Sequence, residues 1–178
     1  MSDRIDRPES LEELRDAYED QLLLVCIGRS LLEEKDPHRL LGLILDACRR
    51  ITGADAGTIF LCEEGERGPM LRFKHSHSAA GGPSYEEFLM PRDERSIAGY
   101  VSLTGEGLNI ADAYLLDPGL PYRFNRGYDL STGYRTKSML VLPMHDHRGD
   151  IIGVIQLINS KERPGAAGPG AADEIILR

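Results

Sequence analysis

Long apolar runs and an excess of basic residues are both missing from this sequence. No apolar run approaches the ~20 residues that a transmembrane helix requires. Lys and Arg number 21 against 29 Asp and Glu, which gives a net charge of −8, whereas a nucleic-acid-binding surface requires a basic patch. The start, MSDRIDRPES, is polar and shows no secretory signal. We therefore expect a cytoplasmic protein that binds neither a membrane nor nucleic acid.

Cysteines and catalytic motifs are also scarce. The three cysteines, Cys26, Cys48 and Cys62, are widely spaced in apolar surroundings, where cysteine usually serves as a small buried side chain. A reduced, cytosolic protein is the natural interpretation. The sequence has no Gly-x-Ser-x-Gly turn and no P-loop. We therefore predict no catalytic residues and no enzyme activity in this chain.

What the sequence does contain is a strong hairpin pattern near its end. Two apolar runs, Ser138–Met144 and Ile151–Ile158, are rich in Val, Ile and Leu and flank a short polar connector with Gly149. This composition is typical of two strands joined by a turn. Both strands are almost continuously apolar, so we expect both faces of the sheet to be covered.

The segment that enters this hairpin is polar. Residues 129–136 gather hydroxyls, charges and an aromatic ring around Gly133. Polar groups at the rim of an apolar sheet can form a small-molecule site. The alternative is a capped turn that feeds a strand, and the spacing alone favours this alternative.

The N-terminal third predicts two helices. Apolar residues from Leu11 to Leu32 recur at three-, four- and seven-residue spacings among charged residues. This helix serves either in dimerisation and signal transmission or in packing on its own domain. Asp36 and Pro37 then look like the cap and first turn of a second helix, which Gly53 ends.

The remaining pattern alternates strands, helices and loops. Strands are expected at residues 56–62, 70–77, 88–91 and 108–110, a helix capped by Ser96 at 97–103, and short helices between 112 and 130, around 122–127. Residues 162–170 are rich in Gly, Ala and Pro and predict a loop. Residues 173–178 begin a helix that we expect to be cut short, with an output domain beyond it.

Several motifs, in order and in register, resemble the GAF domain. The subgroup is the one found in cyclic-nucleotide phosphodiesterases, adenylyl cyclases and related bacterial signalling proteins. The matching stretches are Ser96–Val101 (SIAGYV), Leu108–Tyr114 (LNIADAY), Thr132–Ser138 (TGYRTKS), Leu142–Pro143 and Ile152–Asn159 (IGVIQLIN). Together they make the resemblance specific.

The resemblance implies an α+β, PAS-like fold. Its central sheet is mostly antiparallel, has five to six strands and carries helices on its faces. We expect the N-terminal helix to occupy residues 1–35 and the sensor domain residues 36–178.

The resemblance also implies ligand-binding positions. They fall on Thr58 in the first strand, Ala98 at a helix start, and Asp129, Thr132 and Thr136 before the hairpin. The subgroup's base-stacking aromatic and following acid are not matched, since His75-Ser76-His77 stands there. His75 is therefore the candidate at that end of the site.

A second motif of the subgroup, Asn-Lys-Phe-Asp-Glu, is matched in part. Asn159, Lys161 and Asp173 are the corresponding residues, with Lys161 displaced by one position and Pro169 in place of the Phe. In the family this motif is a structural clamp between the last strand and the last helix.

Two histidine pairs, His75/His77 and His145/His147, are potential halves of a metal site. In the sheet order that the resemblance implies, the pairs stand well over ~10 Å apart at ~4.8 Å per strand. One Zn²⁺ with ligands at ~2 Å cannot join them, so we predict no metal site.

Together these expectations describe a non-catalytic sensory domain. It binds a small ligand, with a cyclic nucleotide as the candidate, forms a homodimer and controls a C-terminal output domain such as a phosphodiesterase or phosphohydrolase, a cyclase or a kinase. The alternative is a ligand-free dimerisation module.

Thr132 and Thr136 would share one face of a helical turn, so Thr132→Val should weaken ligand binding. If Thr132 only caps the turn, the substitution should lower stability and leave affinity unchanged.

Overall fold

The computed structural model describes residues 11–66, 68–78 and 88–160. The chain divides into two compact units between Ile44 and Leu45. The predicted boundary after residue 35 stays a prediction. The elements that belong to the site are all in the second unit, and each unit is described by itself.

The first unit contains the N-terminal helix α1 (Leu11–Glu33) and the first part of α2 (Pro37–Thr52). The carboxylate of Asp36 accepts the backbone N–H of His38 at 2.8 Å, as expected of a helix cap. This hydrogen bond lowers the pKa of Asp36. The cap and the proline after it explain why the second helix begins where the sequence predicts.

The second unit is built on one six-stranded sheet of order β3-β2-β1-β6-β5-β4, in which every paired strand is antiparallel. Its strands and helices, in chain order, are β1 (Ala54–Gly65), β2 (Gly68–Ser78), β3 (Leu89–Pro91), α3 (Ile97–Thr104), β4 (Leu108–Ile110), the 3₁₀ helix η1 (Ala113–Leu115), α4 (Gly127–Thr132), β5 (Met139–His145) and β6 (Ile151–Ser160). The α+β class and the strand number agree with the prediction.

The predicted hairpin is present as β5 and β6, and β6 also pairs with β1 in the middle of the sheet. The carboxylate of Asp146 accepts the N–H groups of Arg148 at 2.8 Å and Asp150 at 3.0 Å. Gly149 has φ 87°, which only glycine adopts freely. The turn chemistry therefore fixes the register of the two apolar strands.

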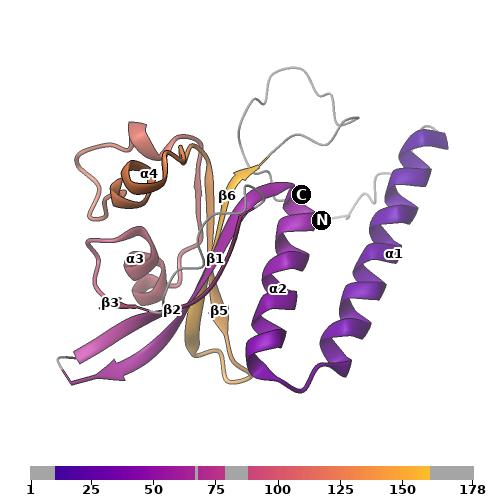
Figure 1. Cartoon of the computed structure of the whole chain (residues 1–178), viewed down its shortest axis with the longest axis horizontal. Coiled ribbons are helices and arrows are strands. Elements are labelled where there is room, and N and C mark those ends of the chain that lie inside the picture. The colour runs from indigo at the N-terminus through magenta and orange to yellow at the C-terminus, as the bar shows by residue number, and fades with distance from the viewer. Residues whose placement is uncertain (1–10, 67, 79–87, 161–178) are drawn as a thin grey trace, which may run out of the picture. The chain divides into compact units, whose positions relative to one another are not determined.

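Helices cover both faces of this sheet. Figure 1 shows α3 and α4 over one face, whereas Leu45–Thr52 of α2 lies over the other. Leu45 is fully buried, and an added Cβ on Gly57 of β1 would meet its Cδ1 at 2.8 Å. The absence of a side chain at Gly57 lets the helix approach the sheet closely.

The hydrophobic core on the α3 face joins the sheet to the loops around α3. Its buried members are Phe60, Leu71, Phe73, Ile97, Ala98, Val101, Ile110, Ala113, Tyr122, Met139, Val141 and Val154. The hydroxyl of Ser96 accepts the N–H of Gly99 at 3.0 Å and begins α3, and Gly105 ends it with φ 73°. The cap predicted at Ser96 is therefore confirmed.

Two expectations about local structure are wrong. Short helices are present in the region where they were expected, 112–130, but they lie at Ala113–Leu115 and Gly127–Thr132 rather than around 122–127. Side chains of Asp112 and Asn125 accept N–H groups two residues on and set these starts. The first two strands also extend beyond the expected ranges of 56–62 and 70–77, to residues 54–65 and 68–78.

A cross-strand ion pair accompanies this extension. Arg72 Nε lies 2.6 Å from Glu63 Oε1 on the neighbouring strand. Opposite charges on paired strands stabilise the pairing. A polar composition at residues 63–66 therefore does not end the strand.

The thiols differ from one another in exposure. Cys26 is exposed on α1, contrary to the expectation of a buried side chain, whereas Cys48 and Cys62 are partly buried. Burial raises the pKa of the Cys48 and Cys62 thiols. Both remain protonated at neutral pH and are therefore poor nucleophiles.

Among the described residues, no helix combines the length and the hydropathy needed to cross a bilayer.

Candidate functional site

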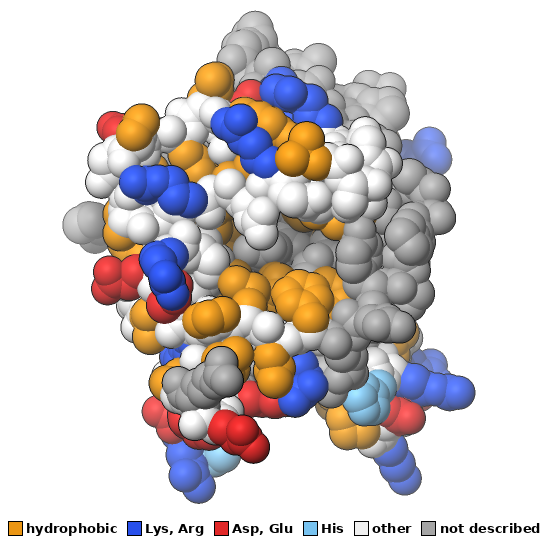
Figure 2. Space-filling model, turned by 60° about the vertical axis from the view of Figure 1, so that its left-hand side comes forward, with side chains coloured by type: hydrophobic (Ala, Val, Ile, Leu, Met, Phe, Trp, Pro, Cys, Tyr) orange, Lys and Arg blue, Asp and Glu red, His pale blue; other side chains and the backbone are white. Residues whose placement is uncertain are grey.

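A cavity of about 490 Å³ lies between the sheet and the segment around α3 and α4. This volume falls within the range of small-molecule sites, ~300–1,000 Å³. Figure 2 shows the hollow in this face of the molecule, with hydrophobic side chains beside it. Its floor comes from β1 and β6, and the residues opposite come from α3, α4 and the loops that flank α4.

One end of the cavity is aromatic. Phe73 of β2 stacks on Phe88 with ring centroids 5.0 Å apart and 20° between the planes. Phe60 of β1 meets both rings edge-on, at 5.9 and 6.5 Å. All three line the cavity, and Phe88 is 44% exposed. An exposed aromatic face at a cavity wall is suited to stacking on a planar ring.

The floor carries two polar side chains among apolar ones. Thr58 of β1 and Gln156 of β6 are direct cross-strand partners, and both line the cavity. Within the part of the chain that the structure describes, neither side chain has a hydrogen-bond partner. A hydroxyl and an amide therefore stand side by side with donors and acceptors for a bound molecule.

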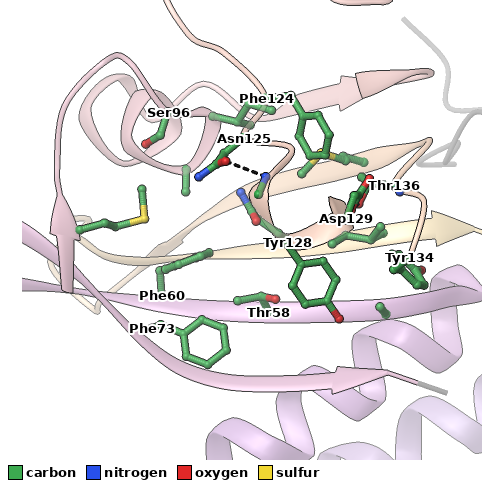
Figure 3. Close-up of a pocket in the computed structure, with 18 of the residues that line it drawn as sticks. Thr58, Phe60, Phe73, Ser96, Phe124, Asn125, Tyr128, Asp129, Tyr134 and Thr136 are labelled. Atoms are coloured by element: carbon green, nitrogen blue, oxygen red, sulfur yellow. Dashed lines mark hydrogen bonds between the residues drawn. The ribbon is translucent and has the colours of Figure 1, made fainter. Parts of the chain in front are cut away.

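The helix α4 forms the opposite wall and contributes Tyr128. In Figure 3 its ring extends from α4 toward the floor near Thr58. Tyr128 lies edge-on to Tyr134, with centroids 6.0 Å apart. Gly133, with φ 71°, ends the helix between them. The two tyrosines therefore give the wall near Thr58 an apolar body with polar tips.

Asp129 holds this wall to η1 and to the segment that precedes β5. Its side chain is 5% exposed, and its carboxylate accepts three hydrogen bonds from the protein. The donors are the Tyr114 hydroxyl at 2.8 Å, the Thr136 N–H at 2.8 Å and the Thr136 hydroxyl at 2.9 Å. A carboxylate offers about four lone-pair sites, so one acceptor site is left after these three bonds.

Tyr114 lies behind Asp129 and outside the cavity lining. The guanidinium groups of Arg126 and Arg135 lie 4.6 and 4.3 Å from the centroid of its ring. The hydrogen bond to Asp129 raises the pKa of the Tyr114 hydroxyl, which stays protonated and continues to donate. Cation–π contacts with these two arginines, one before α4 and one after it, fix the position of the Tyr114 ring. The hydroxyl of this ring in turn donates to Asp129.

The first turn of α3 lines the cavity through Ile97 and Ala98. Helix N-termini present N–H groups and a positive dipole end, which favour anionic groups. Ser96 also lines the cavity, and its hydroxyl accepts the N–H of Gly99, which leaves its own O–H available as a donor. The backbone of this turn and the Ser96 hydroxyl are therefore the groups available to an anion.

Arg123 places a positive charge on the same side. Its guanidinium donates to the carbonyls of Pro118 at 2.7 Å and Tyr122 at 2.8 Å and to that of Leu120. Its backbone N–H donates to the Arg95 carbonyl at 2.9 Å, beside the start of α3. Among the described lining residues, Arg123 and Asp129 alone carry a formal charge.

Four of the six predicted ligand residues line the cavity: Thr58, Ala98, Asp129 and Thr136. His75 lies in β2, where its backbone pairs with Ile59, and its side chain is outside the described part. Their roles in binding stay predictions, since geometry alone shows only where they lie.

Thr132 does not share a face with Thr136. The helix ends at Thr132, and Gly133 turns the chain away from the expected helical turn. The Thr132 hydroxyl is exposed, donates to the Tyr128 carbonyl at 2.9 Å and accepts the Tyr134 N–H at 3.2 Å. The structure thus places Thr132 where the capping alternative expects it, outside the cavity lining.

Asn159 fastens the end of β6 to the segment after α4. Its Oδ1 accepts the Lys137 N–H at 2.7 Å, and its Nδ2 donates to the Arg135 carbonyl at 2.7 Å. Lys161 and Asp173, the other predicted clamp residues, lie outside the described residues. These two contacts of Asn159 therefore run to the segment between α4 and β5.

Sequence patterns missed Phe88, Tyr128 and Gln156. Gln156 alone had a local signal, since it is a polar residue inside the apolar run IIGVIQLI. Phe88 and Tyr128 sit in irregular or short segments, where periodicity carries no information. Within the ranges that the structure covers, no three His, Cys, Asp or Glu residues gather as metal ligands would.

Comparison with known proteins identifies a family and several relatives of this chain. The family model of the GAF domain matches residues 36–174. A cGMP-specific 3′,5′-cyclic phosphodiesterase of Drosophila ananassae is 35% identical over 160 residues, covering 85% of this chain and 13% of the relative. The dual 3′,5′-cyclic-AMP and -GMP phosphodiesterase 11 of Drosophila melanogaster is 32% identical over 164 residues, or 86% and 11%. The chain thus spans about an eighth of these relatives.

Solved structures of similar fold are also GAF domains. The A. aeolicus nlh2 GAF domain in an inactive state has a TM-score of 0.60, with 16% identity over 83% of each chain. The GAF domain of a Coxiella burnetii phosphoenolpyruvate-protein phosphotransferase also has a TM-score of 0.60, with 17% identity over 79% of this chain and 77% of its own. The sheet, the helices and the family match agree, and the chain belongs to the GAF domain family, whose members are regulatory and sensory ligand-binding domains.

Proposed function

We propose that this GAF domain is a regulatory module that binds a cyclic nucleotide and has no catalytic activity of its own. The observation that carries the proposal is the cavity itself, which has an aromatic end, an amide and a hydroxyl on its floor, and a helix N-terminus with Arg123 on its wall. The similarity to GAF-containing stretches of cyclic-nucleotide phosphodiesterases supports this ligand class.

Each part of a cyclic nucleotide has a matching region. The planar base stacks on Phe88 and places its hydrogen-bonding edge on Thr58 and Gln156. The cyclic phosphate carries one negative charge, which the first turn of α3 and the nearby Arg123 favour. Gln156 offers both a donor and an acceptor, so its amide is compatible with either purine base.

Isothermal titration calorimetry with cGMP, cAMP and 5′-GMP tests this proposal. We expect saturable binding of at least one cyclic nucleotide with a negative heat-capacity change, because apolar surface is buried. We expect weaker binding of 5′-GMP, whose open phosphate is larger and carries more charge. Absence of heat and of thermal stabilisation with both cyclic nucleotides would favour the ligand-free alternative.

Gln156→Leu is expected to weaken binding of the preferred cyclic nucleotide about tenfold, with little change in melting temperature. The substitution keeps the side-chain size but removes a donor and an acceptor, and a hydrogen bond contributes ~0.5–1.5 kcal/mol net. Thr104→Val is the matched control, since Thr104 caps the far end of α3 and does not line the cavity. Equal affinities of Gln156→Leu and wild type would contradict the assignment of the floor.

Dimerisation through α1 and control of a C-terminal output domain belong to the same proposal. Binding can change an output only if the ligand prefers one arrangement of the domain. The exposed face of α1 supports dimerisation, because Leu11, Tyr18, Val25 and Leu32 are all exposed within one chain. This face also supports the second candidate function, a ligand-free dimerisation module. A cytoplasmic location stays a prediction from the sequence.

Multi-angle light scattering is expected to report a dimer at micromolar concentrations. Val25→Asp, at a position that is 69% exposed in one chain, should convert the dimer to a monomer, because a charge would enter the apolar contact. Leu115→Asp is the control, since Leu115 is exposed on η1. A wild-type monomer, or a Val25→Asp dimer, would contradict dimerisation through α1.

A further inference from the structure

The hydroxyl of Tyr134 joins the cavity to two distant parts of the chain. The Tyr134 ring lines the cavity. Its hydroxyl donates to Asp55 Oδ2 at 3.1 Å and accepts a hydrogen bond from Asn159 Nδ2 at 3.0 Å. One side chain therefore contacts the ligand space, the start of β1 and the end of β6.

The Asp55 side of this network reaches α2. Asp55 follows the end of α2 by three residues, and its backbone carbonyl accepts the Arg49 guanidinium at 2.9 Å. Ser160 adds a second connection, since its hydroxyl donates to the Thr52 carbonyl at 2.6 Å. The end of α2, the start of β1 and the end of β6 are thus bonded to one another.

The Asn159 side is held in a fixed conformation. Asn159 has φ 53°, and it is the one described non-glycine residue with positive φ. Its amide also bonds Lys137 and Arg135, the residues that follow Tyr134. A left-handed asparagine costs energy, so these contacts must outweigh that cost. A change in the Tyr134 segment therefore acts directly on Asn159, the residue before the last of β6.

At the cavity, the Tyr134 ring meets the edge of Tyr128 on α4. Burial raises the pKa of the Tyr134 hydroxyl, and the charge of Asp55 raises it further. The hydroxyl consequently stays protonated and donates to Asp55 throughout the physiological pH range. A group that enters the cavity and shifts this ring must strain or release the bonds at its hydroxyl.

We propose that Tyr134 couples ligand occupancy of the cavity to the junction of α2, β1 and β6. The inference rests on the proposed ligand-binding function and deepens it by naming the residue that relays the signal. Asp55 and Asn159 are the two groups through which it acts. The relay works if ligand binding favours one geometry of these hydrogen bonds over another.

Hydrogen exchange followed by NMR, with cGMP as the probe, tests the relay. The amides of Ala54 and Ser160, cross-strand partners outside the cavity lining, report on the junction. Saturating cGMP should change their exchange rates about fivefold or more in the wild type. In Tyr134→Phe, compared with the wild type at equal cGMP occupancy, the change should fall below about twofold.

Tyr100→Phe is the matched control. Its hydroxyl donates to Glu106 at 2.8 Å, so the substitution also removes a bond from tyrosine to a carboxylate, but Tyr100 does not line the cavity. This variant should retain the full response to cGMP. Loss of the response in both variants, or in neither, would overturn the relay.

An experiment without any ligand tests the relay independently of which ligand the cavity binds. Asp55→Ala should accelerate exchange of the Leu130 and Gly133 amides, which bond within α4, by about fivefold. In the Tyr134→Phe background, Asp55→Ala should leave the exchange rates of these two amides almost unchanged. An equal effect in both backgrounds would overturn the relay, whereas failure of cGMP to bind would overturn only the cyclic-nucleotide assignment.

Discussion

Asp129→Ala is expected to lower the melting temperature of the domain by about 10 °C and to abolish ligand binding. The carboxylate is buried and accepts hydrogen bonds from Tyr114 and from two groups of Thr136. Each hydrogen bond to a charged group contributes ~1.5–3 kcal/mol, and the buried Thr136 N–H would be left unpaired. A total loss of at least ~3 kcal/mol corresponds to a shift of about 10 °C at this chain length.

Asp117→Ala is the control for this measurement. Asp117 is exposed, and its carboxylate accepts the N–H of Gly119 in a turn. Loss of such a local contact costs less than ~1 kcal/mol. Differential scanning calorimetry of both variants and the wild type measures the change in melting temperature that each substitution causes. Equal melting temperatures for the two variants would show that Asp129 does not hold α4 to η1 and to the segment before β5.

A third variant distinguishes position from charge. Asp129→Asn keeps an oxygen for the Tyr114 hydroxyl and the Thr136 N–H but loses the charge, so its stability should fall between those of Asp129→Ala and the wild type. If ligand affinity per folded molecule falls equally in both, the charge itself acts on the ligand. If affinity recovers in Asp129→Asn, the residue acts by positioning the wall.

The role of Asp129 shows what the sequence could and could not predict. Helix caps and turns could be predicted from the sequence, because the caps at Asp36 and Ser96 and the turn at Gly149 depend on residues within a few positions. The bond between Asp129 and Tyr114 spans 15 residues and depends on how two irregular segments fold back. No periodicity encodes such a contact, so only the family resemblance pointed to Asp129.

The segment from Thr132 to Thr136 illustrates the same limit. A four-residue spacing suggests a shared helical face, but Gly133 permits a left-handed turn that ends the helix. The two hydroxyls then separate: Thr136 is buried against Asp129, and Thr132 caps the helix that Gly133 ends. Glycine in the middle of the motif was the signal for this outcome, since it is the usual residue after a helix C-terminus.

Gly99→Ala is expected to destabilise the domain by about 3 kcal/mol or more, against the usual rule for glycine in a helix. Alanine is normally favoured there by ~1 kcal/mol. In α3, however, an added Cβ would lie 2.0 Å from the Asp93 carbonyl oxygen and 2.7 Å from the Ser96 hydroxyl. The Asp93 oxygen belongs to the backbone, so the clash can be relieved only if the chain moves. Overpacking of this kind costs ~1–3 kcal/mol or more.

The same movement should affect the ligand site. The turn from Asp93 to Ser96 leads into the first turn of α3, where Ala98 lines the cavity. Displacing this turn moves the N–H groups proposed to receive the phosphate. Affinity for the cyclic nucleotide should therefore fall about tenfold or more, even at a temperature where the variant is folded, because binding at such a site depends on its geometry within ~0.5 Å.

Gly28→Ala is the matched control, since an added Cβ there meets no atom within 4 Å. Gly28 lies in α1, so this change should stabilise the helix by up to ~1 kcal/mol and leave the cavity unchanged. Urea unfolding measured by circular dichroism, together with calorimetric titration, compares the two variants. If Gly99→Ala is as stable as Gly28→Ala, then the Asp93–Ser96 turn does not press against α3, and the helix N-terminus is not held in the position that the proposed phosphate site requires.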